Sequence, residues 1–203
     1  MSLTICCSRP TGIASAVKVL NPCPEDLGQI QKMVFWRTGN STVATSLVSS
    51  DAWTTLLAAT DDTKAIVTPF LGAVTIPPSE AREFGGGNET RFGSPIRKGG
   101  ASVPVTANMY EEAQSSVIAA LKELRCETLE VLFINEANQI IYSTASTVSG
   151  FPVCANSLFV SDKGIGGLDD ADHNVLMFNL RPNWSDTLAV SAETTFALEM
   201  INA

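Results

Sequence analysis

Histidine is almost absent from this chain, because His173 is the only one among its 203 residues. Serine and cysteine nucleophiles usually rely on a histidine as general base, so a hydrolase of that kind would have to use His173. No Gly-x-Ser-x-Gly motif and no recognised cysteine signature accompanies it. The sequence therefore predicts that His173 is a structural or solvated loop residue and that the protein is not an enzyme.

Basic residues are also few. Lysine and arginine number 13 against 21 aspartates and glutamates, which gives a formal charge of -8 and a pI near 4.6. Tight binding to nucleic acid requires basic side chains that displace counterions from phosphates, so a sequence-specific DNA or RNA binder is not expected. An acidic surface beside DNA would repel its phosphates and prevent sticking.

Long apolar runs and ordered cysteine spacings are missing as well. No apolar run approaches 18 residues, and the opening "MSLTICCSRP" lacks the basic start and apolar core of a signal peptide. We therefore expect no secretory leader and no membrane partner. The five cysteines follow no zinc or disulfide spacing, and Cys6 and Cys7 are adjacent. This predicts reduced thiols and synthesis in a cytosol.

Motifs for cofactors and metals are also lacking. The glycine runs "FGGGNET" at 84–90 and "GIGG" at 164–167 do not have the spacing of phosphate-binding loops. The acidic run "DDAD" before His173 lacks the pattern of oxygens, glycine and distant glutamate that a calcium loop needs. The sequence therefore predicts no catalytic residue, no cofactor and no metal ligand.

What the sequence does contain is a series of strand-length apolar or alternating runs, at 32–37, 41–48, 64–76, 128–134, 139–144, 174–180 and 195–201. Only 108–126 has firm helical spacing, with Asn108 and Glu111 as a capping box and Val117, Leu121 and Leu124 on one apolar face. A short helix or turn is expected at 50–60. This pattern predicts a single mainly-β domain over 1–203, an antiparallel sandwich or barrel with one packed α-helix and a long extended arm.

The arm is predicted at about 77–104. Nine of the 24 residues from 77 to 100 are glycine or proline and seven are charged, and so long a segment without regular structure usually has a function or is disordered. Its large apolar residues are widely spaced, which suits separate pockets on a partner better than a lid packed on itself. The candidate inter-subunit contacts are Phe84, Arg91, Phe92, Ile96, Arg97 and Lys98.

The order of these features resembles that of a known family. A strand and arm "VTIPPSEAREFGGGNET" with "GSPI", then the pair "LEVLFINEANQIIY" and the C-terminal "GGLDDADHNVLMFNLRPNWSDTL", are similar over 64–203 to major tail tube proteins of tailed bacteriophages. The resemblance implies a β-sandwich or barrel with a flanking helix, assembled as stacked hexameric rings around a channel. It also implies that the arm reaches between subunits and that no active site is present.

The resemblance also implies a location for the protein and a set of partner proteins. It would be a structural virion protein of the tail, assembled in the host cytoplasm from copies of itself. Other partners would be tape measure, terminator and baseplate proteins, with phage DNA only in transit through the channel. The alternatives are a head decoration or head–tail connector subunit, a ligand-binding β-sandwich module using Trp36, Trp53 and Trp184, and a small hydrolase centred on His173.

Overall fold

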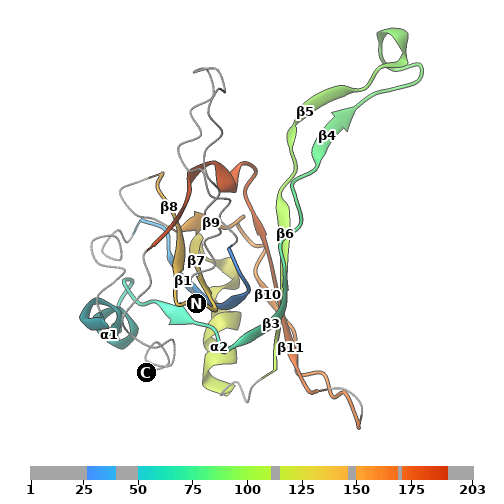
Figure 1. Cartoon of the computed structure of the whole chain (residues 1–203). Helices are drawn as coiled ribbons and strands as arrows, with labels where there is room; N and C mark the ends of the chain where they lie inside the picture. Colours follow the sequence, from blue (N-terminus) through green and yellow to red (C-terminus); the bar gives the residue numbers. More distant parts are fainter. Residues whose placement is uncertain (1–26, 40–49, 111–114, 146–149, 169–170, 192–203) are drawn as a thin grey trace, which may run out of the picture.

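The computed structural model describes residues 27–39, 50–110, 115–145, 150–168 and 171–191. In these ranges the regular structure is mainly β, arranged as two packed sheets from which a two-stranded hairpin projects (Figure 1). Every strand pairing between named strands is antiparallel. The predicted class, a mainly-β fold with a packed helix and a long arm, is confirmed. The strands predicted at 41–48 and 195–201 lie outside the described residues.

The larger sheet has six strands in the order β12-β8-β7-β1-β2, with β9 also paired to β7. Their bounds are β1 Ile30–Arg37, β2 Ile66–Val67, β7 Leu129–Asn135, β8 Ile140–Ser143, β9 Phe151–Pro152 and β12 Leu188–Val190. The apolar runs predicted at 32–37, 128–134 and 139–144 therefore form β1, β7 and β8. Each of these strands contains a continuous apolar run, at 33–36, 131–134 and 140–142, and most of the side chains in these runs are buried.

The smaller sheet has four strands in the order β10-β11-β6-β3. Their bounds are β3 Leu71–Thr75, β6 Val103–Met109, β10 Phe159–Val160 and β11 Asn174–Leu180. In β6 and β11 alternate side chains are buried while the residues between them are exposed or half-buried, as expected for a sheet with one face on the core. Among the described residues, the outer face of this sheet thus has no buried side chain in β6 or β11.

The main core fills the space between the two sheets. Phe35 of β1 meets Phe178 of β11 edge to face, with ring centroids 5.4 Å apart, a favoured geometry for aromatic pairs. At one end, Trp184 packs edge-on against both Phe133 and Phe151. The helical turn η4 (Trp184–Thr187) thus closes that end of the sandwich.

A second core lies on the outer face of the larger sheet. Val34 and Trp36 of β1 point to this side, where helix α1 (Ser50–Ala58) places Trp53 and Leu56 against them. Because α1 covers this face, β1 is buried on both sides and reads as a continuous apolar run. The expectation of a helix or turn at 50–60 is met by α1. Trp36 and Trp53 are buried, so they do not form the surface platform that the ligand-binding alternative requires.

The predicted helix at 108–126 is wrong at its start. Helix α2 spans Ser115–Glu123 and continues into the short turn η3 (Leu124–Cys126), whereas residue 108 lies in β6. Asn108 pairs there with Val175 and with Gly72, so the strand is bonded on both sides. These ladder bonds outweigh the local capping signal, and Glu111 lies outside the described residues. The apolar face is confirmed, because Leu121 is fully buried in the main core.

The strand predicted at 64–76 is divided between the two sheets. β2 pairs with β1 of the larger sheet, and β3 pairs with β6 of the smaller one. Pro69 lies at the crossing, where proline has no backbone N–H to donate to a ladder. Thr68 fixes the crossing, because its backbone N–H donates to Met33 O and its Oγ1 accepts a hydrogen bond from Met33 N, both at 2.9 Å.

Candidate inter-subunit arm

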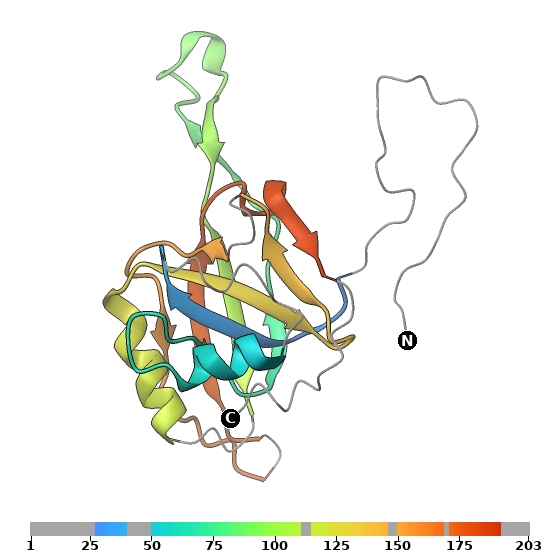
Figure 2. The same cartoon turned by 90° about the vertical axis from the view of Figure 1, so that its left-hand side faces the viewer.

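The arm is a β-hairpin made of β4 (Ala81–Phe84) and β5 (Ile96–Gly100), joined by a loop that contains the turn η2 (Arg91–Gly93). It continues the β3–β6 pair beyond the body, and in both Figure 1 and Figure 2 it stands clear of the two packed sheets. The glycine- and proline-rich composition predicted an extended arm without regular structure. That expectation is corrected, because the backbone of the two sides is paired at Ala81↔Gly100, Glu83↔Arg97 and Phe84↔Ile96.

The hairpin has two different faces. Phe84 and Ile96 are direct cross-strand partners, and the Lys98 ammonium lies 4.3 Å from the centroid of the Phe84 ring. These three residues form one face of the hairpin, with two apolar side chains and one ammonium group. On the strand positions between them, Arg97 Nε is 3.5 Å from Glu83 Oε1, an exposed ion pair of the kind that contributes little to stability.

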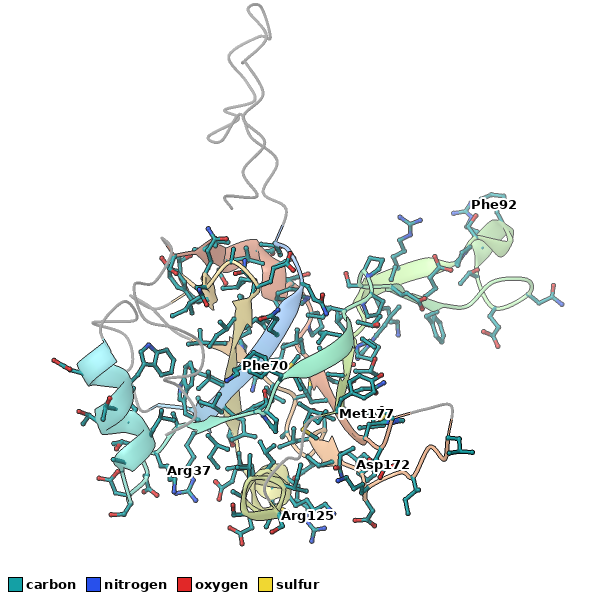
Figure 3. The ribbon with its side chains drawn as sticks, turned by 60° about the horizontal axis from the view of Figure 1, so that its bottom comes forward. Arg37, Phe70, Phe92, Arg125, Asp172 and Met177 are labelled. Atoms are coloured by element: carbon teal, nitrogen blue, oxygen red, sulfur yellow. The ribbon has the colours of Figure 1, made fainter. Side chains whose placement is uncertain are left out.

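The tip of the arm presents one aromatic side chain. Phe92 is 89% exposed and has a φ of 64°, a left-handed conformation that is uncommon for a residue other than glycine. Arg91 lies against it, with its guanidinium carbon 5.1 Å from the ring centroid. Figure 3 shows Phe92 at the far end of the hairpin.

The hydroxyl of Thr90 holds this tip together. Its Oγ1 accepts a hydrogen bond from Gly86 N at 3.2 Å and donates one to Ser94 O at 2.6 Å, so it joins the two sides of the loop. The glycines from 85 to 87 all have positive φ, which the tight path of the loop requires. A side chain at Gly85 would meet Thr90 Cγ2 at 2.3 Å.

No side chain of the hairpin is buried, from Ala81 to Gly100. An isolated two-stranded hairpin is marginally stable in water, and this one receives no stabilisation from a core. Its large apolar side chains are exposed to solvent, and even the cross-strand pair Phe84 and Ile96 is 50% and 54% exposed. Among the residues that the structure describes, the hairpin therefore has no core to which these side chains contribute.

The structure places the six predicted contact residues together on this one element. The three apolar residues were expected to be widely spaced and therefore to suit separate pockets on a partner; the spacing is corrected for two of them, and the pockets stay a prediction. Strand pairing instead brings Phe84 and Ile96 side by side, and only Phe92 stands apart at the tip. The arm therefore offers two apolar contacts, a pair on its face and a single ring at its end.

The loop between β10 and β11 contains His173. Its backbone pairs with Gly164 in both directions, its Nδ1 lies 3.0 Å from Ala171 O, and its ring lies 5.5 Å from that of Tyr110. Asp172 Oδ1 accepts a hydrogen bond from Gly166 N at 3.0 Å. Among the described residues no group of three histidine, cysteine or acidic side chains gathers as metal ligands do. Asp169 and Asp170 lie outside the described residues.

A second set of exposed apolar side chains was not predicted from the sequence. Ile165 and Leu168 project from the β10–β11 loop at 85% and 105% exposure. Phe159 and Met177 are cross-strand partners on the outer face of the smaller sheet. The only sequence signal for the loop was an aliphatic residue on each side of the glycines in "GIGGL", where no periodicity could assign it to a core.

Two hollows lie elsewhere on the surface. One, of about 420 Å³, is bordered by Asp61, Glu123 and Glu127, and in it Arg37 forms ion pairs with Asp62 and Glu127. The other, of about 280 Å³, is uncharged and lined by Leu27, Gly28, Gln29, Ile30, Val74, Ile76, Phe133, Ile141 and Trp184. Within the part of the chain that the structure describes, no helix has the length and hydropathy needed to cross a membrane.

Comparisons with known proteins add little. No family model and no curated protein matches the sequence. Among solved structures, a chain in the cryo-EM structure of the anti-feeding prophage baseplate, 6-fold symmetrised, is 8% identical with a TM-score of 0.33. The match covers 83% of this chain and 96% of that one. Similarity at this level does not establish a shared fold or function.

Proposed function

We propose that this chain is a structural protein of a phage tail, and specifically a subunit of the tail tube that assembles with copies of itself. The observation that carries the proposal is the arm, which exposes Phe84, Phe92 and Ile96 on a hairpin without a core. Fully burying an exposed side chain such as Phe92 is worth about 1.5–3 kcal/mol, and Phe84 and Ile96, which are about half exposed, would contribute less. That free energy becomes available only when the arm docks on another molecule.

The sheets support assembly in a second way. β3 and β10 are the edge strands of the smaller sheet, and exposed edges are a hazard in a monomer but useful in a subunit that polymerises. Heterologous contacts that close form rings, and a second repeated contact stacks them. The proposed assembly is a stack of hexameric rings around a channel that DNA crosses.

The rest of the proposal follows from the resemblance of the sequence to tail tube proteins. Its partners are other copies of the chain and the tape measure, terminator and baseplate proteins, with phage DNA only in transit. The protein is located in the tail of the virion after assembly in the host cytoplasm. It carries no catalytic activity, so His173→Ala assembles normally and no hydrolytic activity is lost with it.

The test is removal of the outer arm. Because Glu83 and Arg97 are cross-strand partners, deleting residues 84–98 joins Glu83 to Gly99 at a place where the strands are already close. The shortened chain is expected to stay folded and soluble but to form no long polymers, whereas the full chain forms tubes. Sedimentation and electron microscopy of both proteins measure this. Tubes of normal length from the shortened chain would contradict the proposal, and full-length protein that forms only isolated knobs or single rings would favour a decoration or connector subunit.

A further inference from the structure

The exposed apolar side chains are not scattered over the molecule. Within the described residues, the eight large hydrophobic side chains that are exposed all lie on the smaller sheet, directly after its strand β6, or on the two segments that extend from the sheet: Phe84, Phe92, Ile96, Tyr110, Phe159, Ile165, Leu168 and Met177. Two groups of them project beyond the sheet, one on the arm and one on the β10–β11 loop. In the part of the chain that the structure describes, the larger sheet and the helices have no exposed large hydrophobic side chain.

These two projecting groups leave the sheet at opposite ends. The arm precedes Val103 at the start of β6, and the β10–β11 loop precedes Asn174 at the start of β11. Because β11 runs antiparallel to β6, with Asn174 opposite Met109 and Leu180 opposite Val103, the two starts lie at the two ends of the sheet. Figures 1 and 2 show the arm above the body and the loop below it.

The loop is built to project its two aliphatic residues. Paired hydrogen bonds between Gly164 and His173, at 2.8 and 3.2 Å, narrow its base. The bond from Gly166 N to Asp172 then ties the two sides together further out. Ile165 and Leu168 therefore stand in solvent without contact to the core.

The two ends also differ in charge. From 80 to 98 the sequence has four arginines and lysines and three glutamates, a formal charge of +1 in a chain of -8. From 161 to 173 it has four aspartates and one lysine, a formal charge of -3, although one of these aspartates, Asp162, already pairs with Lys122. The arm and the loop are thus complementary in charge as well as both apolar, and such complementarity steers association and fixes register.

We propose that the arm of one copy docks on the β10–β11 loop of the next copy, so that Phe84, Phe92 and Ile96 bury Ile165 and Leu168. The inference rests on the proposed function, since it names the receiving surface of the assembling subunit. Each copy carries one arm and one loop at opposite ends, so the contact is head-to-tail and repeats along the strand direction. In a tube this is the contact between one ring and the next.

Two variants test the contact, one with the apolar side chains of the arm replaced and one with those of the loop replaced. The arm variant is Phe84→Ser/Phe92→Ser/Ile96→Ser, and the loop variant is Ile165→Ser/Leu168→Ser. All five residues are exposed, so both proteins are expected to fold, which circular dichroism and thermal unfolding check. Each variant alone is expected to lose long polymers, with about a tenfold or greater weakening of end-to-end association. Mixed together they are expected to pair, because the intact arm of the loop variant meets the intact loop of the arm variant.

The pairing on mixing is the decisive result. Analytical ultracentrifugation with one variant fluorescently labelled would show a complex that contains both proteins and ends after one end-to-end contact. If both variants lose polymers but do not pair, or if the loop variant polymerises like the wild type, the loop is not the receiving surface. A matched control, Phe159→Ser/Met177→Ser, removes two exposed side chains between the ends. It leaves the backbone edge of β10 in place, so this variant is expected to polymerise normally. Equal loss in this control would also overturn the assignment.

The same experiment separates this inference from the proposed function. A wild-type protein that forms neither rings nor polymers contradicts the proposed function itself. A wild type that polymerises, an arm variant that does not and a loop variant that does would leave the proposed function standing and reject only the head-to-tail contact.

Discussion

Leu121 is the one side chain of α2 that is completely buried, and it connects the helix to the core between the two sheets. Val117, Ile118 and Leu124 pack beside it but remain partly exposed. Nine described residues form the helix, Ser115–Glu123, and a segment of that length has little helical stability of its own in water. Its position therefore depends mainly on this one anchor.

Replacing Leu121 by alanine is expected to lower the free energy of unfolding by about 2–5 kcal/mol, because it removes buried methyl groups and leaves a cavity. Chemical denaturation of the unassembled protein measures the change. Glu123→Ala, an exposed position on the same helix, is the matched control and should stay within about 0.5 kcal/mol of the wild type. Equal effects of the two substitutions would contradict the packing of α2.

Glu130 is a half-buried carboxylate on β7. Its Oε2 accepts a hydrogen bond from Gly150 N at 3.1 Å. Burial raises the pKa of Glu130 above its ordinary value of 4.5, although the Gly150 N–H, the Trp36 side chain and Arg181 act in the opposite direction. The folded protein thus holds this proton more tightly than the unfolded chain. Above pH 4.5 and up to the raised pKa, ionisation of Glu130 lowers the free energy of unfolding.

The variant Glu130→Gln is expected to remove this loss, because glutamine keeps an oxygen for Gly150 N but has no charge to bury. Its stability relative to the wild type should rise with pH above 4.5 and then level off, as measured by thermal unfolding across pH. Asp162→Asn provides a control of opposite sign, since the hydrogen bond from Lys122 lowers the pKa of Asp162. That variant should lose stability at neutral pH and match the wild type only in acid. A Glu130→Gln difference that shrinks as pH rises would contradict a raised pKa.

At the scale of single elements, the arm tip depends on one hydroxyl. Thr90 supplies both side-chain hydrogen bonds that join the two sides of the tip loop, to Gly86 N and to Ser94 O. Arg91 and Phe92 follow it directly, so their placement depends on this loop. The tip is far from either core, which separates its stability from that of the sandwich.

The variant Thr90→Val keeps the shape of the side chain but removes both hydrogen bonds. The equilibrium constant for opening of the tip loop is expected to rise about fivefold or more, because losing the hydrogen bonds costs about one to two kcal/mol. Trypsin cleavage at Arg91 should accelerate accordingly, while the global unfolding midpoint stays unchanged. Thr90→Ser retains the hydroxyl and should be cleaved like the wild type. Unchanged cleavage of Thr90→Val would show that the hydroxyl does not hold the tip.

Sequence patterns predicted these elements to different degrees. β1, β7, β8 and β11 were predictable because their side chains are buried on one or both faces, and burial leaves a pattern of apolar residues. The hairpin form of the arm was not, because its strands are short, exposed and interrupted by glycine, so no face imposes a period. The sequence around Asn108 fits a helix cap, but strand pairing on both sides of β6 places this residue in the sheet.

At the scale of the whole molecule, the sequence located the candidate arm but not the loop that we propose it binds. Arm residues were recognisable by their composition, a long glycine- and proline-rich stretch between strands. Ile165 and Leu168 became notable only when the register of β6 and β11 placed their loop at the far end of the same sheet. Such a relation depends on the topology, which a linear pattern does not contain.

The arm continues into β3 and β6, and β6 is bonded to a neighbouring strand on each side, to β11 over seven residue pairs. Antiparallel ladder bonds run perpendicular to the strands. A pull on the arm along its own axis therefore loads this ladder in shear, so that all of its bonds resist together instead of breaking one after another. The arm is thus mechanically anchored in an interior strand of the smaller sheet. A chain of such subunits would transmit tension through its sheets. The β4–β5 hairpin would come apart before the ladder between β6 and β11.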